Sequence, residues 1–173
     1  MGQTQDKRIA FSEAKIKERI QELGRQISQD YAGKELVLIG VLKGSLYFFA
    51  DLTRAIDIPI QIDFITIGTI PNTTNKTGIV RITKDLDLDI TGKHVLLIDD
   101  IIRTGLTTGY LVQNLLSRLP ASLKVCALLF NPDQLLINVP IAYSGFEISK
   151  TRLIGYGMDL DEQDRNLPYI AEL

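Results

Sequence analysis

The sequence predicts an α/β fold built on a mostly parallel central sheet, and three observations lead to this prediction. Short continuous apolar runs recur along the chain, which is the pattern of strands that are covered on both faces. Amphipathic stretches of helical length separate these runs, and parallel strands need such helical crossovers. The length of 173 residues, with 45% hydrophobic and 23% charged residues, is typical of one soluble globular domain with its own core.

The first half of the chain reads as a helix followed by a strand-helix-strand unit. Apolar residues recur at helical spacing from residue 16 to residue 27, which predicts an amphipathic helix. The apolar run ELVLIGV at 35–41 predicts a strand, and SLYFFADLTRAI at 45–56 predicts the crossover helix. A second strand, IQIDFITI at 60–67, follows the breaker Pro59.

A change of composition marks residues 68–84. The segment GTIPNTTNKTGIVRITK is polar and β-branched, and Pro71 and Gly78 interrupt it. Loops of this length are usually lids or disordered segments, so we expect a long excursion or loose hairpin above the sheet that acts as a mobile loop. An ordinary surface loop is the alternative.

The second half of the chain continues the alternation. HVLLID at 94–99 predicts a third strand, LTTGYLVQNLLSRL at 106–119 its helix, and LKVCALLF at 123–130 a fourth strand. The sheet core is therefore expected at about 30–135. Short β-like pieces separated by glycines follow at about 140–173 and predict a small C-terminal addition.

Composition and charge exclude several classes of function. A net charge of −2 gives no sign of nucleic-acid or membrane-surface binding. No segment reaches the ~18 apolar residues of a membrane span, and the stretch MGQTQDKR lacks the apolar core of a signal peptide. Cys126 is the only cysteine and lies in an apolar run, which excludes a disulfide framework and a cysteine metal site. We therefore expect a single domain over residues 1–173, located in the reducing cytoplasm.

The stretch VLLIDDIIRTGLTT, residues 95–108, combines a buried strand with polar chemistry at its carboxyl end. Ligands of open α/β sheets bind beyond the carboxyl ends of the strands, where Asp99 and Asp100 are expected to lie. The turn that follows leads into a helix, whose free N–H groups and positive dipole end favour a phosphate. Gly105 permits close backbone approach, and the threonines of TGLTT supply hydroxyl donors.

Two carboxylates beside a phosphate would repel it, so they are expected to bind something else. Sugar hydroxyls and a cation that accompanies the phosphates are the candidates, and a ligand with ribose, phosphate and Mg²⁺ satisfies every demand. A plain strand-turn-helix junction with an aspartate as helix cap is the structural alternative, but it explains only one of the two carboxylates. A Walker-type phosphate loop fits worse, because no GxxxxGK[ST] motif occurs in the sequence.

These residues resemble a known family. A hydrophobic strand, two acidic residues, two apolar residues and T-G-x-T form the phosphoribosyl pyrophosphate (PRPP) signature of the type I phosphoribosyltransferases. Three further stretches resemble the pyrophosphate loop, the purine pocket and the C-terminal ending of the hypoxanthine-guanine branch: GVLKGSLYFFADL, GFEI with LIGYGMDL, and RNLPYI. The resemblance runs from about residue 10 to the C-terminus. It implies the type I phosphoribosyltransferase fold, a central mostly parallel sheet flanked by helices, with a small hood formed by the C-terminal segment.

The resemblance also implies a role for each matching residue. Asp99 and Asp100 match the acidic pair that holds the ribose hydroxyls and Mg²⁺, and Asp159 matches a Mg²⁺ ligand near the base. The residues implied for the 5′-phosphate are Thr104, Gly105, Leu106, Thr107 and Thr108. Those implied for the pyrophosphate are Leu42, Lys43, Gly44, Ser45 and Arg165, and in this family the peptide bond between the first two can be cis. Those implied for the base are Asn131, Arg152, Leu153 and Asp159.

Four positions depart from the pattern of the hypoxanthine-guanine branch. Arg103 stands at the acid/base position, where the branch has an aspartate, and a guanidinium cannot act as a base because it stays protonated. Asn131 replaces a lysine that reads the 6-oxo group of the purine, and Arg152 replaces an aromatic residue that stacks on the base. Thr69 and Ile70 replace the Ser-Tyr pair of the mobile loop.

Two functions are open at this point. The first is a purine phosphoribosyltransferase of hypoxanthine/guanine type, which uses PRPP and Mg²⁺ in purine salvage, with altered base specificity or a reduced rate. The second is a catalytically weakened PRPP- or nucleotide-binding protein with a regulatory or partner role. Either protein would bind small molecules rather than nucleic acid or membranes, and the family implies a homo-oligomer, a dimer or tetramer.

Overall fold

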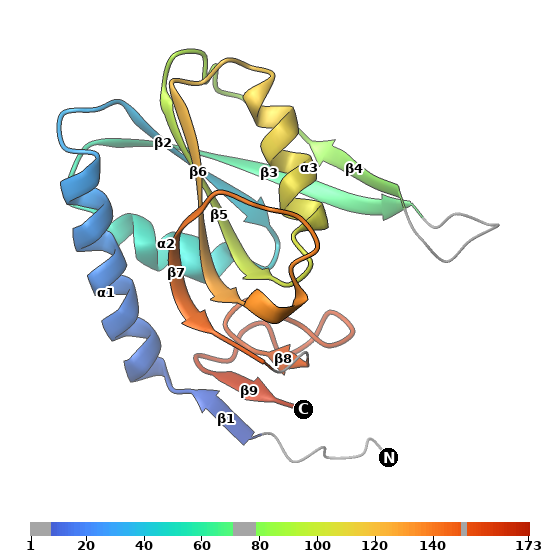
Figure 1. Cartoon of the computed structure of the whole chain (residues 1–173). Coiled ribbons are helices and arrows are strands. Elements are labelled where there is room, and N and C mark those ends of the chain that lie inside the picture. Colours follow the sequence, from blue (N-terminus) through green and yellow to red (C-terminus); the bar gives the residue numbers. More distant parts are fainter. Residues whose placement is uncertain (1–7, 71–78, 150–151) are drawn as a thin grey trace.

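A computed structural model describes residues 8–70, 79–149 and 152–173. Within these ranges a six-stranded sheet has the strand order β4-β3-β2-β5-β6-β7 (Figure 1). Neighbouring strands run parallel from β3 to β7, and β4 is antiparallel to β3. The strands are β2 Leu36–Leu42, β3 Ile60–Ile70, β4 Ile79–Lys84, β5 His94–Ile102, β6 Ser122–Phe130 and β7 Ile141–Glu147.

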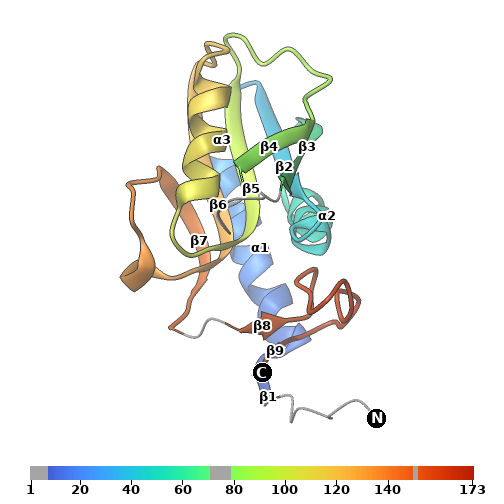
Figure 2. The same ribbon diagram turned by 90° about the vertical axis from the view of Figure 1, so that its right-hand side faces the viewer.

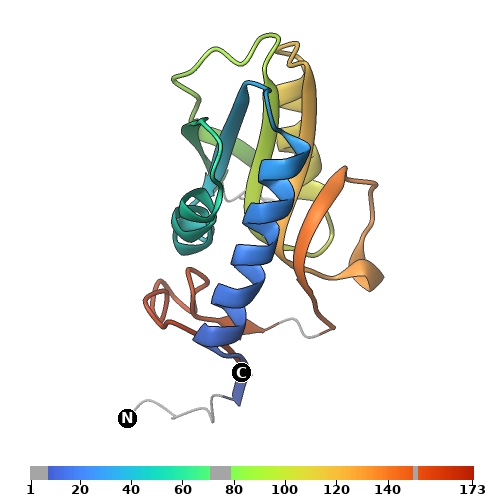
Figure 3. The same ribbon diagram turned by 90° about the vertical axis from the view of Figure 1, so that its left-hand side faces the viewer.

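Helices cover both faces of this sheet. α1 (Glu13–Asp30) and α2 (Leu46–Ala55) lie on one face, and α3 (Leu106–Leu116) lies on the other (Figures 2 and 3). In the described ranges, no helix combines the length and the apolar character that crossing a membrane requires. The predicted α/β fold is confirmed, because every helix and strand expected between residues 16 and 130 is present.

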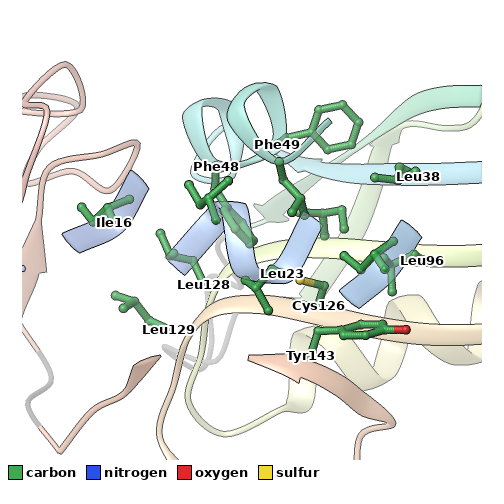
Figure 4. Packing of buried hydrophobic residues seen from close by; sticks show 14 of the residues in the cluster. Ile16, Leu23, Leu38, Phe48, Phe49, Leu96, Cys126, Leu128, Leu129 and Tyr143 are labelled. Atoms are coloured by element: carbon green, nitrogen blue, oxygen red, sulfur yellow. The ribbon is translucent and has the colours of Figure 1, made fainter. Parts of the chain in front are cut away.

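The two faces of the sheet bury separate sets of side chains. Successive residues of a strand point to opposite faces, so Leu96 of β5 packs with α1 and α2 whereas Leu97 packs with α3. Figure 4 shows the first of these clusters, in which Leu23 of α1, Phe48 of α2 and Cys126 of β6 lie together. Cys126 is a buried free thiol, as its apolar surroundings in the sequence predict.

A second sheet forms a hood facing the carboxyl ends of β5, β6 and β7 (Figure 1). Its strands are antiparallel and have the order β1-β9-β8, with β1 Arg8–Phe11, β8 Leu153–Ile154 and β9 Ile170–Glu172. A 3₁₀ turn, η1 Pro132–Gln134, follows β6.

The composition of the hood differs from the prediction in two respects. β7 was expected in the C-terminal hood segment at about 140–173, but it pairs in parallel with β6 and forms an edge of the main sheet. The N-terminal strand β1 belongs to the hood, because it pairs with β9. Phe11 of β1 also stacks on Phe146 of β7 with ring centroids 4.4 Å apart, which links the hood to the main sheet. Tertiary packing decides which strands pair with each other, and the apolar pattern within one segment does not predict that choice.

Part of the expected excursion at 68–84 is regular structure. β3 continues to Ile70, and β4 begins at Ile79, so the described residues form an antiparallel hairpin at the sheet edge. Residues 71–78 of the expected loop lie outside the described residues. The mobility of the hairpin stays a prediction.

Candidate functional site

The carboxyl end of β5 carries the two adjacent carboxylates. Asp99 is buried, and Asp100 is half-buried. The hydroxyl of Thr108 donates to Asp99 Oδ2 at 3.1 Å, and the backbone N–H of Asp100 donates to Asp99 Oδ1 at 3.1 Å. The first turn of α3 therefore holds the first carboxylate in place.

Burial and mutual repulsion act on this pair. Burial raises the pKa of Asp99 well above its ordinary value, and the neighbouring charge of Asp100 raises it further. Burial also raises the pKa of Asp100, while the positive charge of Arg165 acts in the opposite direction. The site thus concentrates negative charge in a poorly solvated place, which favours a cation or hydroxyl donors as its ligand.

The start of α3 is open to an anion. Gly105 precedes the helix with a φ of 77°, a left-handed conformation that suits glycine, and it offers no side-chain cap to the first helical turn. The N–H of Leu106 has only a long contact of 3.4 Å to Thr104 Oγ1. A cavity of about 360 Å³ lies here, lined among others by Asp99, Thr107 and Thr108. The expected phosphate loop and one of the two carboxylates therefore share one cavity.

Arg103 lines the same cavity. Its side chain is half-buried, and its Nε is buried with no hydrogen-bond partner in the described ranges. Only two other buried side-chain nitrogen or oxygen atoms in these ranges share this condition, Arg165 Nε and Tyr31 Oη. Two of the three therefore belong to expected site residues, and buried donors without partners mark places where a ligand can be bound.

The turn after β2 approaches the carboxylates from the neighbouring strand. The Leu42–Lys43 peptide is cis, as the family resemblance implies. A Cβ atom on Gly44 would lie 2.2 Å from Asp100 Oδ2, so any side chain at this position would collide with the carboxylate. Ser45 is buried and donates its hydroxyl to the carbonyl of Val41 at 2.6 Å, which gives it a structural role within the turn.

The loop between β8 and β9 brings a cluster of charges to the same turn. Arg165 Nη2 lies 2.8 Å from Asp159 Oδ1, and Arg165 Nη1 donates to the carbonyl of Gly157 at 2.7 Å. Gly157 has a φ of 103° and packs so closely that a Cβ there would lie 1.9 Å from the carbonyl oxygen of Gly44. Lys43 is mostly exposed and forms a salt bridge of 3.0 Å with Glu162. This salt bridge links Lys43, an expected pyrophosphate residue, to the loop that carries Arg165, another expected pyrophosphate residue.

The residues expected to bind the base are less closely assembled. Asn131 is buried, and its Oδ1 accepts the N–H of Asp133 at 3.1 Å, so it caps η1. Arg152 is exposed, whereas Leu153 is buried in the hydrophobic core. None of these residues, nor Asp159, lines the cavity beside α3. The backbones of Thr69 and Ile70 pair with Val80 and Ile79 in the hairpin.

The carboxylates fit Mg²⁺ in their chemistry, since this ion prefers oxygen ligands. In the described part of the chain, no three His, Cys, Asp or Glu side chains converge on a common metal position, so Asp159 does not join Asp99 and Asp100 in one site. A magnesium ion usually takes only one or two protein carboxylates and completes its shell with phosphate oxygens and water. The pair at the end of β5 is sufficient for such an ion.

Glu162 and Gly157 are site residues that sequence reasoning missed. Glu162 lies in an acidic turn that resembles an ordinary solvated loop, and nothing local distinguishes it from its acidic neighbours. For Gly157 a signal existed, because two glycines flank Tyr156 in the stretch LIGYGMDL.

Comparisons with known proteins agree with this geometry. A family model described as the phosphoribosyl transferase domain matches residues 11–163. The hypoxanthine-guanine phosphoribosyltransferase of Mycobacterium tuberculosis is 46% identical over 173 residues, covering 96% of this chain and 86% of that protein. The hypoxanthine phosphoribosyltransferase of Escherichia coli K12 is 42% identical over 167 residues, covering 95% and 94%. A crystal structure of a hypoxanthine-guanine phosphoribosyltransferase from Bacillus anthracis superposes with a TM-score of 0.89 at 42% identity, covering 95% and 97%.

Proposed function

The chain belongs to the phosphoribosyltransferase family, and we propose that it transfers the phosphoribosyl group of PRPP to a purine base of the hypoxanthine/guanine type. The products are the nucleoside 5′-monophosphate and pyrophosphate, a reaction of purine salvage. The observation that carries the proposal is the meeting of the Asp99–Asp100 pair with the uncapped start of α3 at the end of β5. The alternative, a PRPP- or nucleotide-binding protein with a regulatory or partner role, has no support among the relatives described above.

The proposed reaction exchanges one bond at the ribose. The bond from C1′ to a pyrophosphate oxygen breaks, a bond from C1′ to a base nitrogen forms, and the proton of that nitrogen passes to water. Asp99 and Asp100 would hold the ribose hydroxyls and Mg²⁺, which when bound neutralises charge on the departing pyrophosphate. The free N–H groups at the start of α3 would bind the 5′-phosphate, and Lys43, Gly44 and Arg165 would bind the pyrophosphate.

Arg103 bears on the rate of this reaction. Arg103 lines the cavity of the expected 5′-phosphate loop, and a fixed positive charge there would attract phosphate. Binding that is equally strong in the ground state and the transition state does not accelerate the chemical step. We therefore expect tight binding of the nucleotide and slow turnover, because Arg103 cannot accept the proton of the base.

The test is steady-state release of pyrophosphate from PRPP and Mg²⁺ with hypoxanthine or guanine. The wild type should release pyrophosphate with at least one of these bases. Arg103→Asp should raise kcat and loosen monophosphate binding, since a proton-transfer group typically contributes about 10²- to 10⁴-fold. Arg103→Asn is the matched control, because it removes the charge without supplying a base and should loosen binding without raising kcat.

Two results would count against these assignments. No pyrophosphate release with any base would contradict the transferase. A wild type that already turns over hypoxanthine or guanine as fast as typical enzymes, at about 1 to 10³ per second, would show that Arg103 is a tolerated substitution.

The proposal also covers the base pocket, the hairpin, the location of the protein and its assembly. Asn131, Arg152, Leu153 and Asp159 would select the base, and the hairpin at Thr69 and Ile70 would close over it. Amide hydrogen exchange with and without nucleoside monophosphate tests that closure, because a closing hairpin should gain protection.

A cytoplasmic location agrees with the buried free thiol of Cys126. A homo-oligomer, dimer or tetramer, is proposed by analogy with the family, and light scattering would test it.

A further inference from the structure

Glu162 lies between the two cations that would bind pyrophosphate. Its Oε2 is 3.0 Å from Lys43 Nζ and 3.3 Å from Arg165 Nη2. Lys43 belongs to the turn after β2, and Arg165 belongs to the loop between β8 and β9. One carboxylate oxygen thus contacts both sides of the expected pyrophosphate site, in the way a phosphate oxygen of the ligand would.

The two cations do not depend equally on this carboxylate. Arg165 is held by Asp159 at 2.8 Å and by the carbonyl of Gly157 at 2.7 Å, and only 24% of its side chain is exposed. Removing Glu162 would therefore leave its guanidinium in place. Lys43 and Glu162 are 65% and 66% exposed, and ion pairs at such exposed positions are weak and easily exchanged. An incoming anion can therefore displace the ion pair between Lys43 and Glu162, and the structure of the site does not depend on this pair.

The backbone nevertheless keeps Glu162 at this position. Its N–H donates to Asp159 Oδ2 at 2.9 Å, and its φ of 62° lies in the left-handed region. Non-glycine residues seldom adopt that region, so the turn that presents the side chain is a specific one. The carboxylate is consequently available next to the cations whenever an anion leaves them.

We propose that Glu162 is an internal competitor for the pyrophosphate site, which the pyrophosphate group of a ligand displaces. This inference rests on the proposed function, since it takes Lys43 and Arg165 as the pyrophosphate residues. Any anion that contacts both Lys43 and Arg165 must first displace the Glu162 carboxylate from them. Glu162 thereby lowers the affinity of the site for pyrophosphate.

The test is calorimetric titration with pyrophosphate in MgCl₂, and in parallel with inorganic phosphate. Glu162→Gln keeps the shape and removes the charge, so it should bind pyrophosphate about 1.5- to fivefold more tightly, the range expected for an exposed ion pair. Inorganic phosphate, if it contacts the same two cations, should bind more tightly by a similar factor. Asp161→Asn is the matched control, because this exposed carboxylate is in the same loop and has no salt bridge within the described ranges. It should bind like the wild type.

The outcomes separate the inference from the proposed function. If the wild type binds pyrophosphate and Glu162→Gln binds it equally or less well, Glu162 is not a competitor and the transferase proposal stands. Equal tightening in Asp161→Asn would reduce the effect to general charge and overturn the inference as well. A wild type that binds no pyrophosphate overturns both. Glu162→Asp keeps the charge on a shorter side chain and should tighten binding less than Glu162→Gln.

Discussion

At the scale of single residues, the candidate site combines two neighbouring carboxylates with buried guanidinium nitrogen atoms that lack a hydrogen-bond partner in the described ranges. Asp99 and Asp100 adjoin at the end of β5, and burial raises the pKa of both. The Nε atoms of Arg103 and Arg165 are buried without a partner in the described ranges. Such groups cost folding free energy when they are left alone. A ligand that brings both a cation and phosphates would satisfy donors and carboxylates together.

The carboxylate pair yields the first prediction at this scale. Replacing both residues, Asp99→Asn with Asp100→Asn, should weaken Mg²⁺-dependent binding of PRPP or nucleoside monophosphate by several-fold or more. The midpoint of thermal unfolding should not fall, because the substitution removes repulsion between two neighbouring buried charges. Calorimetry and thermal denaturation measure the two effects. Asp133→Asn, which changes an exposed carboxylate outside the cavity, is the control. Unchanged affinity in the double variant would remove the pair from the site.

At the scale of elements, one buried carboxylate ties the hairpin strands to the connection that leads into β5. Asp63 of β3 accepts the N–H groups of Phe64, Asp87 and Leu88 at 2.7, 2.8 and 2.9 Å, and Lys84 of β4 lies 3.3 Å away. Burial alone would raise the pKa of Asp63, but these donors outweigh it and lower the pKa. The carboxylate therefore positions the base of the hairpin beside the site.

This contact predicts a pH-dependent loss of stability. Asp63→Asn should lower the free energy of unfolding at pH 7 by about 1 to 3 kcal/mol, the cost of weakening buried hydrogen bonds. The pKa of Asp63 in the folded protein lies below its unfolded value of about 3.9. The stability that this carboxylate contributes is therefore complete above about pH 3.9 and is lost as the pH falls through the folded pKa. Urea unfolding measured at pH 7 and at a series of lower pH values should show the difference between the two proteins become smaller as the pH falls below about 3.9.

A control tests whether burial is the cause. Asp87 also pairs with Lys84, at 2.8 Å, but its side chain is 83% exposed. Asp87→Asn should therefore change stability much less at either pH. A difference between wild type and Asp63→Asn that is as large in acid as at neutral pH would contradict the linkage.

At the scale of the whole molecule, the first and the last strand of the described residues pair in the hood. β1 pairs with β9, so residues 8–11 close the sheet that carries the loop of Asp159 and Arg165. α1 then connects the hood to the main sheet, where Arg19 donates to the carbonyls of Ser144 and Gly145 at 2.8 and 3.0 Å. The position of the loop thus depends on contacts far away in the sequence.

The contact between Phe11 and Phe146 is expected to support this arrangement. Full burial of a phenylalanine side chain contributes about 1.5 to 3 kcal/mol, and Phe11 is only partly buried. Phe11→Ala should therefore lower stability by about 1 to 2 kcal/mol and weaken pyrophosphate binding, because the hood loop loses support. Ile9→Ala, at a position that is 55% exposed, is the control and should leave both quantities nearly unchanged. Chemical denaturation and calorimetry measure the two effects, and equal behaviour of the two variants would contradict the prediction.

Much of the fold was determined by local pattern. The apolar runs of β2, β5 and β6 are continuous because both faces of a parallel sheet are covered, and the helices show the spacing of a one-sided apolar face. The carboxylate pair and the TGLTT turn are also local, since strand end, turn and helix start follow one another in the chain. These residues lie close together because they are consecutive in the chain, so the sequence alone was sufficient to predict their chemistry.

Only the tertiary structure decided which of these segments contact one another. β7 resembles the other short strands of the tail, and only its pairing with β6 assigns it to the main sheet. The close contact of Gly44 with Asp100, and the pairing of Glu162 with Lys43 and Arg165, unite segments that are distant in sequence. Such contacts depend on sheet order and on how closely the hood approaches the turn after β2. A pattern within one segment does not contain that information, because packing between segments selects it.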